Sequence, residues 1–95
     1  MEFSRDLREA VMAGDITVSF RLWRRPRVRP GGRYSVGPAQ IEVDSMELMP
    51  FAAITPTDVR RSGERDRESV RQRAAHAGPI VDDTLLYRVG FHLLR

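Results

Sequence analysis

The chain has 95 residues, of which 41% are hydrophobic and 31% charged; this predicts one globular domain over residues 1–95 and excludes a second catalytic module. It contains no cysteine, which excludes disulfides, thiolate catalysis and cysteine-ligated zinc. The net charge is +3, all 16 basic residues are arginine, and the positive charge gathers in residues 21–41 and 60–76, where it would attract anionic ligands.

The N-terminal segment predicts a helix over residues 4–13. Apolar residues recur at helical spacing from Phe3 to Val11. Ser4 can cap the start of this helix, and Gly14 suits the left-handed residue that ends many helices.

Residues 16–23 predict a strand with one buried face. Apolar side chains at every second position from Ile16 to Leu22 alternate with more polar ones, which is the pattern of a half-buried strand. The other face is expected to point away from the core, with side chains at intervals of about 7 Å, and to form a strip suited to binding. This strip consists of Thr17, Ser19, Arg21 and Trp23.

Residues 21–33 contain six arginines and the chain's one tryptophan, with no acid among them. Pro26 and Pro30 would interrupt a sheet ladder, so a surface loop is predicted. The guanidinium group is a planar fork that fits phosphate oxygens and stacks on flat rings, so this segment suits nucleic acid. Two plainer interpretations stay open, because a charge run often just solvates a surface and an arginine-only composition also follows from GC-rich codons.

The rest of the chain predicts strands and short helices. A bulge is expected beyond Ser45, Thr55-Pro56 indicates a helix start, and Gly63 and Gly78-Pro79 indicate two helix ends. The element order predicts an α+β fold, a small mixed β-barrel flanked by short helices. The predicted elements are strands at residues 34–36, 39–49 and 87–94, a helix between Thr55 and Gly63, and a helix at residues 66–77.

Four segments together carry a family resemblance. They are Ala13-Gly14 followed by Thr17–Arg21, then Gly31–Tyr34, Ile54–Gly63 and Leu86–Phe91. In order and spacing they resemble an ASCH domain, a compact relative of the RNA-binding PUA fold, over about residues 7–94. The resemblance implies a PUA-like β-barrel with an RNA-binding cleft beside the first helix and strand. Some ASCH members hydrolyse acetylated cytidine with a lysine, a threonine and a glutamate, and at least one branch is described as a ribonuclease.

The resemblance transfers these enzyme residues incompletely. The family lysine corresponds to Ile16, whose apolar side chain cannot replace it. The threonine corresponds to Ser19, which keeps a hydroxyl, and the glutamate falls near residues 62–64. Arg21 matches an arginine of the family. The resemblance therefore favours binding over catalysis, and whether the chain is an enzyme stays open.

The leading hypothesis is a cytoplasmic module that binds RNA or another single-stranded nucleic acid. Residues 1–6 lack a secretion signal, and no apolar run approaches the roughly 20 residues of a membrane helix, so no membrane contact is expected. His76 and His92 form no recognisable ligand set and are interpreted as structural, so neither a metal nor another cofactor is expected. The predicted contacts are phosphates on Arg21, Arg24, Arg25, Arg27, Arg29 and Arg33, the strip at Thr17 and Ser19, and a base stacked on Trp23 or Tyr34.

Two other hypotheses come from different functional classes. A small hydrolase acting on RNA or acetylated cytidine would use Ser19 as nucleophile and Glu64 as general base, with an arginine in the lysine's place. No base is visibly placed to activate Ser19, and neighbouring Arg61 and Arg65 favour the charged form of Glu64. An arginine can still stabilise transition-state charge. In the third hypothesis the chain binds a small anionic ligand or another protein, and the arginines serve solubility.

Overall fold

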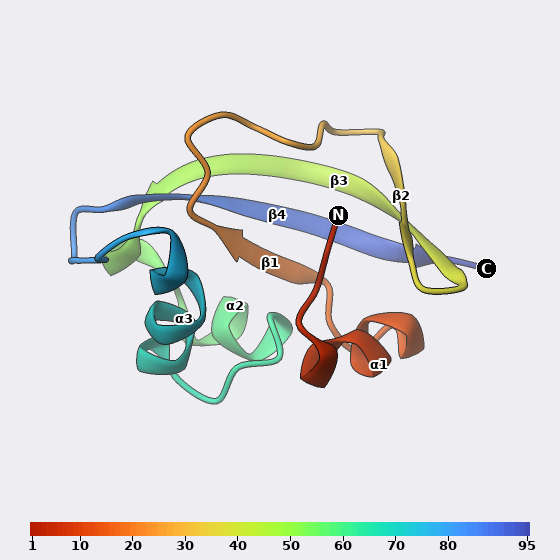
Figure 1. The fold of residues 1–95 in the computed structure, drawn as a ribbon, viewed down its shortest axis with the longest axis horizontal. Coiled ribbons are helices and arrows are strands. Elements are labelled where there is room, and N and C mark those ends of the chain that lie inside the picture. The colour runs from red at the N-terminus through yellow and green to blue at the C-terminus, as the bar shows by residue number, and fades with distance from the viewer.

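The fold is a four-stranded antiparallel sheet with three helices packed along it (Figure 1). The structure is a computed structural model that describes the backbone of residues 1–95 and every side chain except that of residue 77. The sheet has the strand order β1-β4-β3-β2. The strands are β1 (Val18–Arg21), β2 (Arg33–Val36), β3 (Ala39–Pro50) and β4 (Leu85–Leu94). The helices are α1 (Arg5–Ala13), α2 (Pro56–Arg61) and α3 (Arg67–Ala74), with 3-10 turns at Phe51–Ala53 and Ala75–Ala77.

The helices and the longest loop cover different parts of the sheet. Figure 1 shows α1, α2 and α3 below β1, and residues 22–32 running above β3 from the end of β1 to β2. We call residues 22–32 the arginine loop. Of the helices described, none is both long and apolar enough to cross a membrane.

Local sequence signals account for most helix ends. The Thr55 Oγ1 atom accepts a hydrogen bond from the backbone N of Asp58 at 3.2 Å and so caps α2. Gly14 ends α1 with a φ of 83°, a left-handed conformation that favours glycine. Ser4 precedes α1 as predicted, but its side chain makes no capping bond. The helix predicted over residues 66–77 is shorter than expected, because a 3-10 turn follows the end of α3.

The sheet is open, which corrects the predicted barrel. The α+β class and the flanking helices are confirmed, but the sheet is antiparallel throughout, and hydrogen bonds do not close it over the described backbone. The reason lies in the arginine loop, where Pro26 and Pro30 have no N–H to donate to a ladder. The end of this loop does join β3, since Gly31 N donates to the Val43 O at 2.7 Å and Val43 N donates to the Gly32 O at 2.9 Å. β1 and β2 therefore remain the two edges of the sheet.

Two apolar clusters form the core. The first cluster joins α1 and β2 to the adjoining halves of β3 and β4. The second cluster joins α2 and α3 to the other ends of β3 and β4. Phe20 and Leu22, in β1 and just after it, pack against the second cluster, whereas Trp23 packs against the first. β1 consequently lies between the two clusters.

An ion pair joins α2 to β4. The Arg88 Nε and Nη2 atoms donate to the two carboxylate oxygens of Asp58, at 2.7 and 3.0 Å. The side chains of Asp58 and Arg88 are only 13% and 18% exposed. The hydrogen bonds from Arg88 hold the pKa of Asp58 below its ordinary value, and they raise the pKa of Arg88. This pair fixes α2 against the sheet.

Asp58→Asn should destabilise the protein by about 3 kcal/mol, because it leaves the Arg88 guanidinium without a carboxylate in a mostly buried place. The pKa of Asp58 is lowered in the folded state, so its contribution is present above the pKa of the unfolded chain and is lost as the pH falls through the folded pKa. Urea unfolding followed by circular dichroism, from neutral to acidic pH, measures both effects. Asp83→Asn, at an exposed turn residue, is the control. A loss of stability in Asp58→Asn that is below about 1 kcal/mol and does not change with pH would contradict the assignment of Asp58 and Arg88 as a buried ion pair.

Candidate functional site

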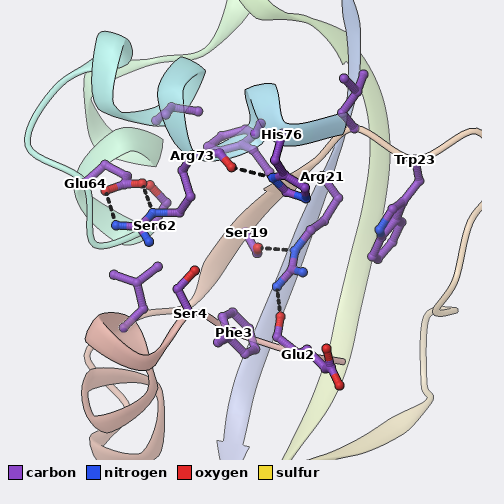
Figure 2. Close-up of a pocket in the computed structure, with 15 residues that line it drawn as sticks. Glu2, Phe3, Ser4, Ser19, Arg21, Trp23, Ser62, Glu64, Arg73 and His76 are labelled. Carbon is purple, nitrogen blue, oxygen red and sulfur yellow. Dashed lines mark hydrogen bonds and ion pairs between the residues drawn. The ribbon is translucent and has the colours of Figure 1, made fainter. Parts of the chain in front are cut away.

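A pocket of about 350 Å³ opens beside β1 (Figure 2). Three parts of the chain line it: residues 2–4 with Leu7, residues 19–23, and the α2–α3 region from Ser62 to His76. Since β1 is an edge strand, helix side chains and the N-terminal segment meet it there instead of another strand. The lining includes residues of both core clusters, so the pocket lies where the two clusters meet.

Arg21 lies in this pocket as a cation without a carboxylate partner. Its Nε donates to the Ser19 Oγ at 2.8 Å, and its Nη2 donates to the backbone carbonyl O of Glu2 at 2.5 Å. The guanidinium carbon lies 4.9 Å from the centre of the Phe3 ring and 5.8 Å from that of Trp23. Among the side chains that the structure describes, no carboxylate forms an ion pair with Arg21. Burial lowers the pKa of Arg21 to about 10, against an opposing effect of the Glu2 carboxylate, so the group stays charged at neutral pH.

The Ser19 hydroxyl is oriented by Arg21 and not by a base. Its oxygen accepts the Nε–H of Arg21, which leaves the O–H to donate to a ligand. A serine becomes a nucleophile when an adjacent base removes its proton. Among the described side chains, the Ser19 hydroxyl is hydrogen-bonded to Arg21. Arginine does not deprotonate in proteins, so Arg21 cannot take the proton of Ser19. The geometry therefore makes Ser19 a hydrogen-bond donor in the pocket.

Arg73 of α3 forms a clamp with carboxylates from two other parts of the chain. Its Nη1 and Nη2 donate to Asp6 of α1 at 3.0 and 2.8 Å, and its Nε and Nη2 donate to Glu64 at 2.5 and 3.3 Å. The Glu64 side chain is only 9% exposed. Hydrogen bonds from Arg73 hold the pKa of Asp6 below its ordinary value, and those to Asp6 and Glu64 raise the pKa of Arg73. Both oxygens of Glu64 are thus engaged, and the clamp ties α1 to α3 at the pocket wall.

His76 and residues 2–4 line the pocket, although sequence reasoning did not place them there. The His76 Nδ1 lies 2.8 Å from the backbone carbonyl O of Arg73. Because a carbonyl only accepts, Nδ1 carries the hydrogen and Nε2 is the acceptor of the neutral ring. Residues 2–4 are held by Phe3, which is buried with its ring centroid 5.6 Å from that of Phe91. No local pattern signals these positions, because they depend on packing between distant segments.

The arginine loop lies outside the pocket except at its start. Trp23 is half-buried, lines the pocket and packs on Tyr87 with ring centroids 6.1 Å apart. Val28 is buried, at 7% exposure, and anchors the middle of the loop in the first core cluster. The predicted phosphate contacts inside the loop are exposed and do not line the pocket. They are Arg24, Arg25, Arg27 and Arg29.

Three other predicted contact residues form hydrogen bonds or an ion pair within the chain and do not line the pocket. The Thr17 backbone N donates to the Arg61 O at 2.9 Å. Arg33 of β2 pairs with a glutamate of β3, with 3.1 Å between its Nε and the carboxylate Oε1. The half-buried Tyr34 accepts a hydrogen bond at its hydroxyl from the backbone N of Arg29 at 3.0 Å. Of the predicted strip, Ser19, Arg21 and Trp23 line the pocket, whereas Thr17 does not.

A second group of polar side chains lies on β3 and β4. Glu42, Asp44 and His92 each offer one metal-ligating atom, and these atoms lie within 4.8 Å of one another. The strand register sets Glu42 opposite His92, and the bulge in β3 brings Asp44 alongside, where its Oδ1 is 2.7 Å from the His92 Nδ1. Sequence reasoning missed this group because it considered the two histidines without the carboxylates. The group is largely exposed, and Arg33 already bonds Glu42.

Comparison with known proteins identifies the architecture. No family model matches the chain, and no curated protein matches it. The chain is similar in structure to the ASCH domain from Lactobacillus crispatus JV V101, with a TM-score of 0.72 and 16% identity over 93% of this chain and 70% of that one. It is also similar to a protein of the DUF984 family from Enterococcus faecalis V583, with a TM-score of 0.69 and 15% identity over 94% of this chain and 67% of that one. The chain has the fold of an ASCH domain.

Within this ASCH fold, the structure shows the surroundings of Ile16, the position at which the sequence departs from the family pattern. Ile16 stands where the family resemblance places a lysine, and its side chain is 3% exposed in the first core cluster. Gly63 lies directly against it, since a Cβ added at Gly63 would come within 2.5 Å of the Ile16 Cδ1. Position 16 therefore contributes apolar packing, and the cations that line the pocket are Arg21 and Arg73, of which Arg73 is paired with carboxylates.

Arg73→Met should raise the pKa of Asp6 toward its ordinary value, because the hydrogen bonds from Arg73 are the main reason that it is low. NMR titration of the carboxyl carbons measures the change. In the wild type, the stability that Asp6 contributes is present above its unfolded pKa and is lost as the pH falls through its folded pKa. Arg65→Met removes an equal charge from an exposed side chain and is the control. An Asp6 pKa that Arg73→Met leaves unchanged would show that the clamp does not exist in solution.

Proposed function

We propose that the chain is a single-stranded nucleic-acid-binding module that holds one nucleotide of an RNA in its pocket and the adjoining phosphates on the arginine loop. The observation that carries the proposal is Arg21, a half-buried guanidinium without an ion-pair partner among the described side chains. A buried charge is costly to keep unless something stabilises it, so such a group is suited to a polar or anionic ligand.

The size and lining of the pocket support a single nucleotide. Its volume of about 350 Å³ stands at the lower end of the range of ligand pockets, roughly 300–1,000 Å³. Phe3 and Trp23 contribute aromatic rings, and base stacking on such rings tolerates every base. Trp23 lines the pocket and lies at the start of the arginine loop. An RNA strand that leaves the pocket past Trp23 therefore reaches that loop.

The arginine loop supports backbone contacts. Its four inner arginines are exposed, and residues 21–33 contain no acid. Arginines that neutralise phosphates release condensed counterions, which drives binding without sequence preference. RNA is the proposed partner because an RNA-binding cleft is what the ASCH resemblance implies. A fold does not by itself imply a function, so the proposal depends on the pocket and the loop.

The hydrolase hypothesis draws less support from the same geometry. The Ser19 oxygen accepts a hydrogen bond from Arg21, and both oxygens of Glu64 accept hydrogen bonds from Arg73. The two side chains are therefore not arranged as nucleophile and general base. Ile16 is buried where the family resemblance places a lysine. RNA cleavage is retained as an outcome of the binding experiment.

Arg24→Ala combined with Arg25→Ala should weaken RNA binding about tenfold or more, because two phosphate contacts are lost. The slope of log K against log salt concentration should fall by about 1.4, since each contact to a single strand contributes about 0.7. Fluorescence anisotropy with a labelled ten-nucleotide single-stranded RNA over a salt series measures both quantities.

The matched control is Arg60→Ala combined with Arg95→Ala, which removes the same charge from exposed positions outside the arginine loop. Equal affinity for the loop variant and the wild type would remove the proposal. A DNA of the same sequence tests the preference for RNA. The RNA is analysed on a gel after each titration, and cleavage that Ser19→Ala abolishes would favour the hydrolase instead.

Trp23→Ala should cost about 1–3 kcal/mol of RNA binding, which is the range for a lost base stack, and Trp23→Phe should retain most of the affinity. Trp23 is the chain's one tryptophan, so quenching of its fluorescence by RNA reports directly on the pocket. Trp23 also packs on Tyr87, so a thermal melt checks that each variant is folded. Wild-type affinity in a folded Trp23→Ala variant would exclude stacking at this residue.

A further inference from the structure

We propose that Arg21 makes the pocket select a nucleobase edge with two adjacent hydrogen-bond acceptors, as guanine offers with O6 and N7 and cytosine with O2 and N3. This inference rests on the proposed function and adds a base preference to it. Arg21 is then the residue that determines specificity, and Ser19 assists it.

The charges that line the pocket argue for a neutral base in it, with the phosphates outside. Arg73 is committed to Glu64 and Asp6. The Glu2 carboxylate lines the pocket and already acts electrostatically on Arg21. A phosphate in the pocket would meet the Glu2 carboxylate beside Arg21, and the neutral pair of Arg73 and Glu64 would offer it no free cation, whereas a neutral base would meet no repulsion from Glu2. The exposed arginines of the loop are the better place for phosphates.

The donors of Arg21 are fixed in position. A guanidinium has five N–H groups, and the two hydrogen bonds to Ser19 and to the Glu2 carbonyl leave three, including both on Nη1. Figure 2 shows Arg21 extended between Ser19 and Glu2, with Trp23 to one side. The contacts with Phe3 and Trp23 hold the guanidinium between aromatic rings. Arg21 therefore presents a planar, oriented set of donors to the pocket.

Adjacent donors match adjacent acceptors. Guanine shows O6 and N7 together as acceptors, whereas adenine shows N7 next to the N6 donor. Cytosine shows O2 next to N3, whereas uracil places an N–H between its two carbonyl oxygens. The O–H of Ser19 adds a further donor beside Arg21. The Glu64 carboxylate could accept hydrogen bonds from a base edge that carries donors, but both of its oxygens already accept hydrogen bonds from Arg73. Adenine and uracil are thus the poorer ligands.

The test compares single-stranded RNAs of five nucleotides, UUXUU, in which X is uracil, adenine, guanine, cytosine or 7-deazaguanine. Fluorescence anisotropy with the wild-type chain should give at least about fivefold tighter binding for guanine or cytosine than for adenine and uracil, as expected for a bidentate base contact. A guanine preference that 7-deazaguanine loses assigns the O6 and N7 edge. A cytosine preference assigns the O2 and N3 edge.

Arg21→Lys is the decisive variant, because lysine keeps the charge but lacks the planar fork. The preference among bases should fall below about twofold, while the salt dependence stays at the wild-type value. Circular dichroism and a thermal melt check the fold. If Arg21→Lys does not fold, Ser19→Ala replaces it, since it removes the O–H donor and the acceptor that orients the Arg21 Nε; the preference should then fall at least about twofold.

The possible failures are distinguishable. No binding of any of the five RNAs would remove the proposed function itself. Binding with equal affinity for all bases would leave a binding module but overturn the inference about Arg21. A preference that a folded Arg21→Lys variant retains in full, or that Ser19→Ala leaves unchanged where Arg21→Lys does not fold, would also overturn it. A structural role of Arg21 alone would change all affinities together and not their ratio.

Discussion

The open edge of β1 is the constraint on which the candidate site depends. The segment after β1 contains two prolines and cannot add a hydrogen-bonded strand to that edge, so helices and the N-terminal segment occupy the space. Side chains do not fill such a space as closely as a paired strand would, and the pocket is what they leave. The Arg73 clamp holds the two sides of this space together, because it bonds α1 and α3 at once.

The charges of the molecule differ in how they are compensated. Arg88 and Arg73 each have carboxylate partners, so their desolvation is offset within the fold. Arg21 is stabilised instead by a hydroxyl, a backbone carbonyl and two aromatic rings. These contacts are weaker than an ion pair, and the two apolar clusters supply the stability that allows such an arrangement. This contrast separates Arg21 from the arginines that merely hold elements together.

Much of the fold could be predicted from sequence patterns, because the signals for helix ends and for strand alternation lie within short segments of the chain. The cap at Thr55, the left-handed Gly14 and the alternation through Ser19 and Arg21 could all be predicted. The expectation that Ser19 and Arg21 point away from the core was only partly correct, since residues 2–4 cover them. Composition indicated an exposed arginine segment, but it could not show that most of this segment lies outside the pocket.

The unpredicted parts of the site depend on long-range contacts. The Arg73 clamp joins residues 67 positions apart in the chain, and no spacing rule reports such a pair. His76 enters the pocket because α3 packs against β1, which a single sequence does not reveal. The barrel expectation failed for a related reason: local alternation identifies strands, but it does not decide whether two edge strands meet.

The buried Val28 has a consequence for the cost of binding. It divides the arginine loop into two short spans, and the backbone bonds of Gly31 and Gly32 to Val43 fix the far end. A free arginine-rich tail must lose conformational entropy when it meets a polyanion, and that loss weakens its affinity. Here much of that ordering is already complete before any ligand arrives. The backbone positions that carry the loop's arginines are therefore set in advance, so the spacing of a ligand's charges matters as well as their number.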